Sequence, residues 1–329
     1  MVGTLSGMRT LQSKAAGLSA PGAGGGRPGG DPVTADPYAA AAGLVSRSAA
    51  AYASSIPEHP ADEGFFGPGS VAWRVSSDLS SLVAGLRALH MQALHPLAMA
   101  GVDQHSDWRQ DPVGRLAATN AYLATVTFGD RGSAERVAAR VRRIHEHVRG
   151  VDTVTGRAYA AGDPALLLWV HATFVDSRLA AAALFGSPLT AADADRYVAE
   201  TVTEAELVGV PRDLVPASTA GLRTYIESVR PELRCTPAAR ESMDYLLDPP
   251  GLDEDMAEIW LDVRDAAVAA LPGWAQEMYG YDQPPPLTDA RRTEIHQALG
   301  VLDTVFLAEP GVLEARQRIA LRERAARPA

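Results

Sequence analysis

Cysteine and lysine are almost missing from this sequence of 329 residues, since Cys235 and Lys14 are the only examples. A single cysteine excludes an internal disulfide, a cysteine-rich zinc site and the C-x-x-C-H attachment of a covalently bound haem. Any iron would have to be held by histidine, carboxylate or one thiolate. Nearly all positive charge is arginine, and 30 basic against 40 acidic groups leave a net charge of −10. That charge argues against a nucleic-acid partner, whose phosphates would be repelled.

Several motifs that carry common chemistries are also missing. The sequence has no H-E-x-x-H, which excludes a zincin-type metalloprotease, and no E-x-x-H, which argues against a ferritin-like di-iron centre. It has no G-x-S-x-G elbow of the α/β-hydrolases and no Walker A loop. Hydrolase and nucleotide-binding functions therefore have no support.

No stretch is free enough of polar groups to predict a stable membrane insertion. The apolar window at 82–102 contains Arg87, His90 and His95, and the window at 166–185 contains His171 and two charged residues. Charges at such depths are costly in lipid. The N-terminus has neither a twin arginine nor a compact apolar core, which argues against a signal peptide. We therefore expect a cytoplasmic protein.

The chain divides into one large domain with two flanking segments. Residues 1–36 are rich in Gly and Pro and predict a disordered tail. Residues 37–310, which begin with a short amphipathic helix at 37–56, predict a single helical domain. Residues 311–329 predict a C-terminal helix and a charged tail.

Helical periodicity dominates the central domain, and no convincing strand alternation appears. Asp78 is expected to cap a helix that ends or kinks at Pro96. Before Asp78, a Gly-Pro-Gly turn is expected beside Phe65, Phe66 and Trp73, which are interpreted as core aromatics. Three further helices are expected from Asp111-Pro112 to Gly129, from Ser133 to Gly150, and from Asp163-Pro164 through the nearly all-apolar run that follows. Further helical segments lie near 191–209, 217–229, 236–247, 253–270, 287–307 and 311–326. The predicted fold class is all-α.

The segment "RRIHEHVRG", residues 142–150, places two histidines and several arginines on one helix. At about 100° per residue, Val137, Val141, Ile144 and Val148 form an apolar stripe that should face the core. His145 lies at the edge of this stripe and Arg149 follows one turn later on the same face. His147 lies on the other flank, so one metal ion cannot bind both histidines.

The preceding helix offers a second polar pair one turn apart, Arg115 and Thr119, among apolar neighbours. A buried arginine needs an anion or several acceptors. Thr119 can bond a ligand or its own backbone. An all-α protein with isolated inward histidines and nearby arginines is compatible with haem b, which needs one axial imidazole, an apolar pocket and cations for its propionates.

Five ordered blocks resemble one known family, that of the oxygenase MpaB and the latex-clearing rubber oxygenases. They are "FGPGSVAWRV", "LRALHMQALHPLAMAGVDQHSDWRQDPVGRLAAT", "VRRIHEHVRG", "YAAGDPALLLWVHATFVDS" and "DRYVAE". The resemblance that rests on them covers roughly residues 64–275. The resemblance implies an all-α, globin-reminiscent haem b protein that acts on O2 and an apolar organic substrate.

The resemblance also implies roles for individual residues. The family's axial histidine, followed four residues later by arginine, matches His145 and Arg149, and its Arg-x-x-x-Thr pair matches Arg115 and Thr119. Rubber oxygenases have a lysine before that threonine which can cap the distal iron face, and Ala118 stands there in this sequence. This departure argues against polyisoprene as the substrate.

Alternatives remain open for each of these residues. His171, inside the apolar helix, is a rival axial ligand or a satisfied core histidine, and His95 is expected to cap backbone groups beside Pro96. His90, His105 and His147 are interpreted as structural or solvent-facing. Arg115 can pair with a carboxylate such as Asp111 or contact a propionate or substrate oxygen. The leading function is a haem-dependent oxygenase; the alternatives are a haem or small-molecule sensor or carrier without turnover, and a helical protein that has lost its cofactor.

Overall fold

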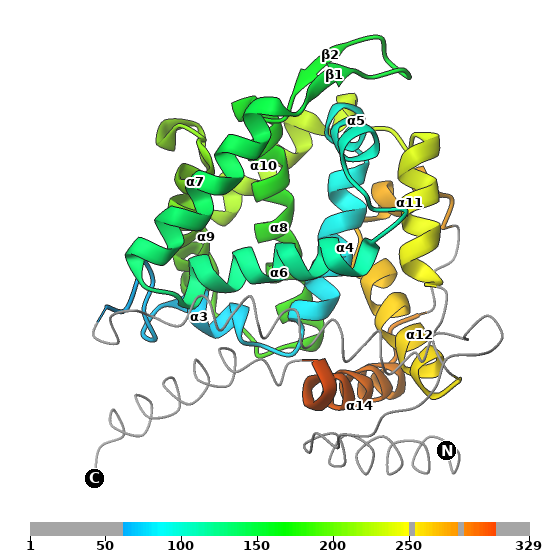
Figure 1. Cartoon of the computed structure of the whole chain (residues 1–329). Helices are drawn as coiled ribbons and strands as arrows, with labels where there is room; N and C mark the ends of the chain where they lie inside the picture. The colour runs from blue at the N-terminus through cyan, green and yellow to red at the C-terminus, as the bar shows by residue number, and fades with distance from the viewer. Residues whose placement is uncertain (1–61, 250–253, 282–285, 307–329) are drawn as a thin grey trace, which may run out of the picture.

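The computed structural model describes residues 62–249, 254–281 and 286–306, and within them the chain is built almost entirely of α-helices (Figure 1). The proposed tail at 1–36, the helix at 37–56 and the segment at 311–329 lie outside the described residues. The helices are α3 (Val71–Ser76), α4 (Ser81–Ala93), α5 (Pro96–His105), α6 (Pro112–Phe128), α7 (Arg131–His147), α8 (Pro164–Phe185), α9 (Ala191–Val208), α10 (Thr219–Val229), α11 (Pro237–Leu247), α12 (Glu254–Ala269), α13 (Gly273–Tyr279) and α14 (Asp289–Phe306).

The all-α prediction is confirmed, but several short elements were not predicted. Helices α3, α5 and α13 were not expected, nor were the 3₁₀ turns at Arg212–Leu214 and Arg230–Glu232. A two-stranded antiparallel hairpin, β1 (Arg149–Val151) and β2 (Ala158–Ala160), joins α7 to α8, with Gly150 opposite Tyr159. Three-residue strands are too short to show an alternating pattern in sequence, because the pairing itself holds them in place.

Two of the expected helix starts are confirmed by their caps. The Asp111 carboxylate accepts a hydrogen bond from the Gly114 N–H at 2.9 Å and begins α6. The Asp163 carboxylate accepts one from the Ala165 N–H at 2.9 Å and begins α8. A proline follows each aspartate in the first turn, where its missing N–H costs nothing.

Other boundaries were wrong. Helix α4 begins at Ser81, because the Asp78 carboxylate instead binds the N–H groups of Ser80 and Ser187 at 2.9 and 3.0 Å, and so ties this turn to the end of α8. Helix α7 begins at Arg131, since Asp130 rather than Ser133 is its cap. It ends at His147 rather than Gly150, where the chain turns into β1.

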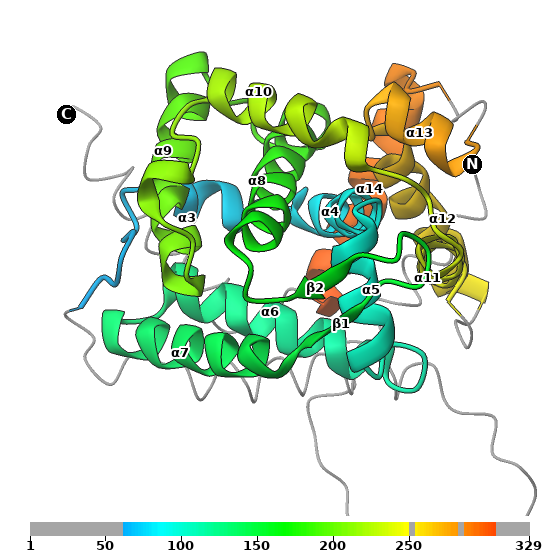
Figure 2. The same ribbon diagram turned by 90° about the horizontal axis from the view of Figure 1, so that it is seen from above.

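Helix α8 is the centre of the fold. It packs against α4 most extensively, and against α9 and α10 on its other sides, while α12 and α14 add a second layer beyond α4 (Figures 1 and 2). Trp169, Ala172 and Thr173 are fully buried. By length and composition α8 is the one helix among the described residues that would suit a membrane span, yet 67% of its apolar window is buried inside the protein. Its place in the core explains its apolar sequence.

Helices α6 and α7 form an outer layer on the remaining side of α8 (Figure 2). They pack on each other, and they reach the rest of the protein through α3 and α9. Neither makes more than a few close backbone approaches to α8. We call the part of the molecule between this outer layer and α8 the interlayer region, defined by Arg115 and Tyr122 on α6, His145 on α7, and Val170 and His171 on α8.

Candidate functional site

The inward face of α7 matches the expected apolar stripe only in part. Ile144 is 53% exposed, whereas Ala134 and Ala138 are completely buried. Val137, Val141 and Val148 are half-buried, and Val148 packs against a core cluster. The stripe therefore lies beside the two alanines on the buried side of the helix, with Ile144 as its one exposed member.

His145 lies on this alanine face. Counting 100° per residue, it falls within about 20° of Ala134 and Ala138. Its side chain is partly exposed, and its Nδ1 is buried without a hydrogen-bond partner among the described residues. Burial lowers the pKa of the His145 imidazole below its usual value. The ring is thus neutral at physiological pH, with a lone pair that is not committed to the protein.

The facing side of α8 is less covered than the rest of that helix. Val170 is 41% exposed although it is apolar, and His171 and Phe174 are partly exposed beside it. Because α4, α9 and α10 occupy the other sides of α8, this face points toward α6 and α7 (Figure 2). Burial lowers the pKa of His171 to about 4, so this histidine is also neutral.

Helix α6 brings Arg115 and Thr119 to the outer layer. The Arg115 guanidinium donates to the Ser106 hydroxyl, and within the described chain it makes no ion pair with Asp111 or any other carboxylate. Burial lowers the pKa of the guanidinium, which nevertheless keeps its charge. The Thr119 hydroxyl is exposed and donates to the Arg115 carbonyl at 3.1 Å, so only its lone pairs remain for a ligand.

Arg149 does not share a helix face with His145, as the sequence had suggested. It is the first residue of β1, its side chain is exposed, and its guanidinium donates to the Glu146 carbonyl. The chain changes direction after His147, so a spacing of four residues no longer means one helical turn. The structure therefore gives no support for Arg149 as a cofactor contact.

The other histidines have structural roles or face solvent, as expected. His95 caps α5, since its Nδ1 accepts from the Ala98 N–H at 3.4 Å. His90 is fully buried, its Nδ1 donates to the Leu86 carbonyl at 2.8 Å, and burial lowers its pKa to about 4. His105 is exposed. His147 is exposed and its Nδ1 donates to the Arg143 carbonyl at 2.8 Å.

Sequence reasoning missed one carboxyl group near this region. Glu204 on α9 is only 9% exposed, and burial raises its pKa to about 7, opposed by the charge of Arg178 on α8. Burial raises the pKa of Tyr122 on α6, and the nearby charge of Glu204 raises it further. Tyr197, Thr201 and Glu204 follow i, i+4, i+7 spacing, which could have shown that this polar residue lies on the inward face of α9.

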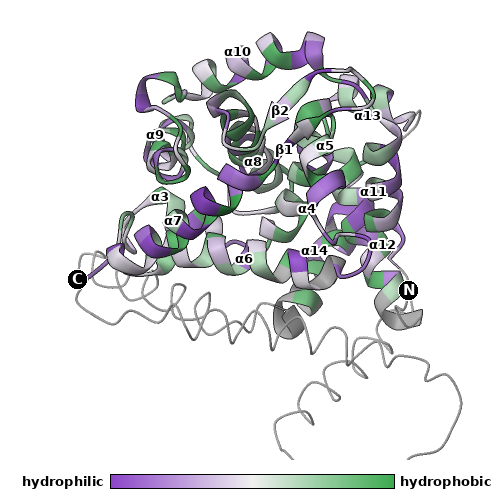
Figure 3. Cartoon of the chain, turned by 45° about the horizontal axis from the view of Figure 1, so that its top comes forward, coloured by the Kyte–Doolittle hydropathy of each residue, from purple (hydrophilic) through white to green (hydrophobic). Residues whose placement is uncertain are grey.

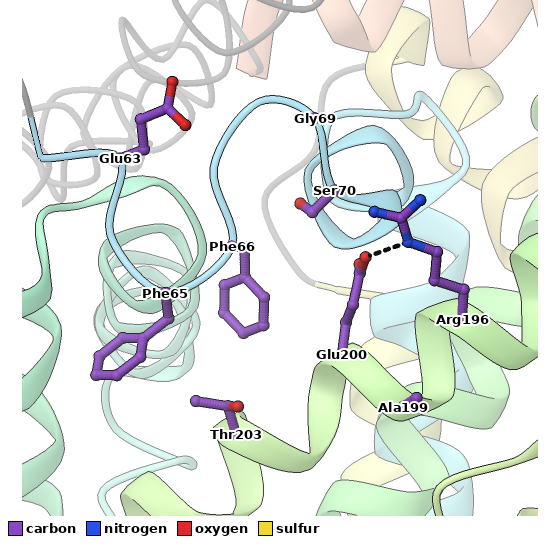
Figure 4. A pocket seen from close by; sticks show the side chains of 9 residues that line it. All are labelled: Glu63, Phe65, Phe66, Gly69, Ser70, Arg196, Ala199, Glu200 and Thr203. Atoms are coloured by element: carbon purple, nitrogen blue, oxygen red, sulfur yellow. Dashed lines mark hydrogen bonds and ion pairs between the residues drawn. The ribbon is translucent and has the colours of Figure 1, made fainter.

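A separate open pocket of about 410 Å³ lies beside the loop that precedes α3 (Figure 4). Phe65 and Phe66 line it together with the ion pair of Arg196 and Glu200, whose Nε–Oε1 distance is 2.9 Å. Phe66 also packs on the core, as predicted, and Trp73 is buried against Phe128 with ring centroids 5.3 Å apart. None of the candidate site residues lines this pocket.

The residues of the interlayer region fit a single-ligand haem site better than a multi-ligand metal site. In the described ranges, no three His, Cys, Asp or Glu side chains converge on one point. An unpartnered imidazole nitrogen, a guanidinium without a counter-charge and uncovered apolar side chains are what an axially ligated macrocycle with carboxylate arms requires. Burial raises the pKa of the Cys235 thiol, which disfavours the thiolate needed for ligation.

Comparison with protein families identifies one family that matches most of the chain. The family described as ER-bound oxygenase mpaB/B'/rubber oxygenase, catalytic domain, matches residues 73–303, which is more than two thirds of the chain. The match contains α4 to α13 and all residues of the interlayer region. No curated protein and no solved structure matches the chain significantly, so the likeness to globins stays a prediction. The chain belongs to the mpaB/rubber oxygenase catalytic-domain family.

Proposed function

We propose that this oxygenase-family protein is an oxidoreductase that holds haem b in the interlayer region through His145 and uses O2 on an apolar organic substrate. One observation carries the proposal. His145 occupies the inward face of α7, with a neutral ring and a buried, unpartnered nitrogen. Buried polar atoms in proteins are usually satisfied. Two histidine nitrogens are buried without a protein partner among the described residues, His90 Nε2 and His145 Nδ1, and of these only His145 belongs to the interlayer region.

Each residue of the region would have a defined part. His145 supplies the lone pair for the iron, and the low pKa keeps that lone pair free of a proton at neutral pH. Arg115, which has only the Ser106 hydroxyl as a partner, binds a carboxylate. Val170 and its apolar neighbours exclude water and contact the substrate. When bound, the haem supplies the redox chemistry with O2.

Thr119 would act toward the ligand by accepting a hydrogen bond rather than donating one. Its hydroxyl hydrogen is engaged with the Arg115 carbonyl, which leaves its oxygen to accept a hydrogen bond from a protonated oxygen of the ligand or substrate. The same contact also fixes Thr119 to the turn that carries Arg115. The two residues would therefore move together if the outer layer shifts on binding.

The direct test is haem binding by three single histidine variants of the purified protein. His145→Ala should lose the Soret band and the haem stoichiometry measured by pyridine haemochrome. His147→Ala is the matched control, because that exposed ring lies two residues away on the same helix and should leave both unchanged. If His171→Ala loses the Soret band and haem while His145→Ala keeps them, the axial ligand is His171 on α8 and the assignment of His145 is refuted.

Turnover is tested separately from binding. The haem-loaded protein should consume O2 when supplied with an apolar alkene, and the His145→Ala protein should not. Stoichiometric haem with no O2 uptake across alkenes and hydroxylatable substrates would favour the alternative function of a sensor or carrier.

A further inference from the structure

The outward face of α7 carries a row of two arginines and a histidine opposite His145. Counting 100° per residue, Arg140, Arg143 and His147 lie roughly 140–200° from His145 around the helix. All three side chains are exposed, and purple runs along much of α7 in Figure 3. We call these residues, together with the exposed Ile144 beside them, the α7 outer face.

This face differs in charge from the protein that carries it. The whole chain has a net charge of −10, yet α7 contains five arginines and two glutamates. Arg140 and Arg143 make no ion pair or side-chain hydrogen bond within the part of the chain that the structure describes. Arginines elsewhere are commonly paired, as Arg109 is with Asp103 and Glu241 at 2.8 and 2.6 Å.

An apolar side chain lies at the edge of this row. Ile144 is 53% exposed; it follows Arg143 directly in sequence and lies one turn after Arg140, about 40° away around the helix. Charged residues around an apolar contact are typical of transient protein interfaces, in which complementary charge steers the encounter and a small apolar patch holds it.

We propose that the α7 outer face is the docking surface for a small acidic one-electron carrier protein. The proposal rests on the proposed function, because it takes His145 as the iron ligand. One helix, about 10 Å across, separates the outer face from the His145 ring, which is a short path for an electron. The reduced carrier gives up one electron, and the iron held by His145 gains it, passing from the ferric to the ferrous state.

The test uses the full-length haem-loaded protein and a plant-type [2Fe–2S] ferredoxin as the acidic probe. Binding should weaken steeply as salt rises, and Arg140→Glu/Arg143→Glu should raise the Kd about tenfold or more at low salt. Arg223→Glu/Arg234→Glu is the matched control. It changes the net charge equally, and both of its arginines are exposed and away from α7. The control should leave the Kd within about twofold of wild type.

Electron transfer gives a second readout. Stopped-flow reduction of the iron by reduced ferredoxin should slow in the Arg140/Arg143 variant and not in the control. Reduction by dithionite, a small ion that needs no docking surface, should occur in every protein. Equal effects of the two double variants would show only a net-charge effect and overturn the proposal.

The failure of this proposal is distinguishable from failure of the proposed function. If haem is not bound through His145, the histidine variants show it before any carrier is added, and ferredoxin binding to the unloaded protein still tests the surface. Salt-dependent binding of phosphatidylserine vesicles through Arg140 and Arg143, without binding of ferredoxin, would overturn the assignment in favour of a membrane surface.

Discussion

Single residues in the interlayer region show how burial sets protonation in this protein. His145 and His171 lose affinity for protons because their charged forms would be poorly solvated, while Glu204 gains affinity for the same reason. All three groups therefore favour their neutral forms. An apolar substrate enters such a region without having to displace strongly hydrated charges.

Glu204 gives a prediction about pH and stability. Its pKa is about 7 in the folded protein against an ordinary value of 4.5, so between these values the folded state holds a proton that the unfolded chain has released. Stability contributed by this group is present below pH 4.5 and is lost as pH rises to 7. Glu204→Gln should remove that loss. At pH 8 the free energy of unfolding of the variant should be up to about 3 kcal/mol higher than that of wild type.

The measurement is urea unfolding of both proteins from pH 5 to pH 8. Glu135→Gln serves as the control, because its side chain on α7 is exposed and should leave the pH profile unchanged. Parallel profiles for wild type and Glu204→Gln would contradict a buried carboxyl with a raised pKa.

Arg115 gives a prediction that separates stability from cofactor binding. Because no carboxylate in the described chain pairs with it, Arg115→Met should not lower the unfolding free energy of the haem-free protein. It should lower haem affinity about tenfold or more, since a charged hydrogen bond contributes about 1.5–3 kcal/mol. Arg149→Met is the comparison, and its exposed position predicts little change in either quantity. A large loss of haem-free stability in Arg115→Met would show that the arginine is structural.

At the scale of elements, the arrangement of α6, α7 and α8 decides which residues can meet. Helices α6 and α7 are packed on each other and on α3 and α9, whereas α8 is packed on α4, α9 and α10. His145 and His171 therefore lie on helices that do not pack extensively on each other. A flat apolar ligand between them would replace contacts that the protein does not make itself.

The packing of α7 can be tested with two adjacent alanines. Ala138 is completely buried and Ala139 is partly exposed. Ala138→Leu should overpack the inward face of α7 and cost about 1–3 kcal/mol in thermal or chemical unfolding. Ala139→Leu should change stability by less than about 0.5 kcal/mol. The opposite order would mean that α7 is rotated and that His145 does not lie on its buried face.

Caps and helix types were predictable from sequence because their causes are local. Asp111 and Asp163 were identified correctly, since an aspartate followed by proline specifies a helix start within a few residues. The end of α7 was not predicted correctly. The hairpin that replaces its last turn depends on contacts with residues distant in sequence. Gly150 is needed there since a Cβ would lie 2.7 Å from the Tyr159 hydroxyl, which donates to Gln104 on α5.

The candidate site was predictable in part. His145 was placed at the edge of the apolar stripe, and the structure has it there beside Ala134 and Ala138. The complete burial of these alanines was not foreseen, since alanines can form a helix contact without any strongly apolar pattern. Arg115 was expected to be buried, but its lack of an acidic partner depends on tertiary structure. Glu204 was missed because an acidic residue is ordinarily assigned to the solvent-facing side of a helix, and only its spacing from Tyr197 and Thr201 indicates burial.

For the whole molecule, family membership and the interlayer region lead to the same conclusion by different routes. The family match shows an oxygenase catalytic domain over residues 73–303, and the structure contributes a neutral, unpartnered imidazole inside that range. The distribution of charge suggests where an electron carrier would bind, because the proposed docking surface, the α7 outer face, lies on the side of α7 opposite this imidazole. The central claim of the account is that His145 binds iron.

Chemical rescue of His145→Gly tests that claim most directly. The variant should lose the Soret spectrum of the wild-type protein, and added imidazole should restore its position, because free imidazole can occupy the space of the missing ring and bind the iron. The same treatment of His147→Gly should change nothing. A His145→Gly protein that keeps the wild-type spectrum without imidazole would contradict the account.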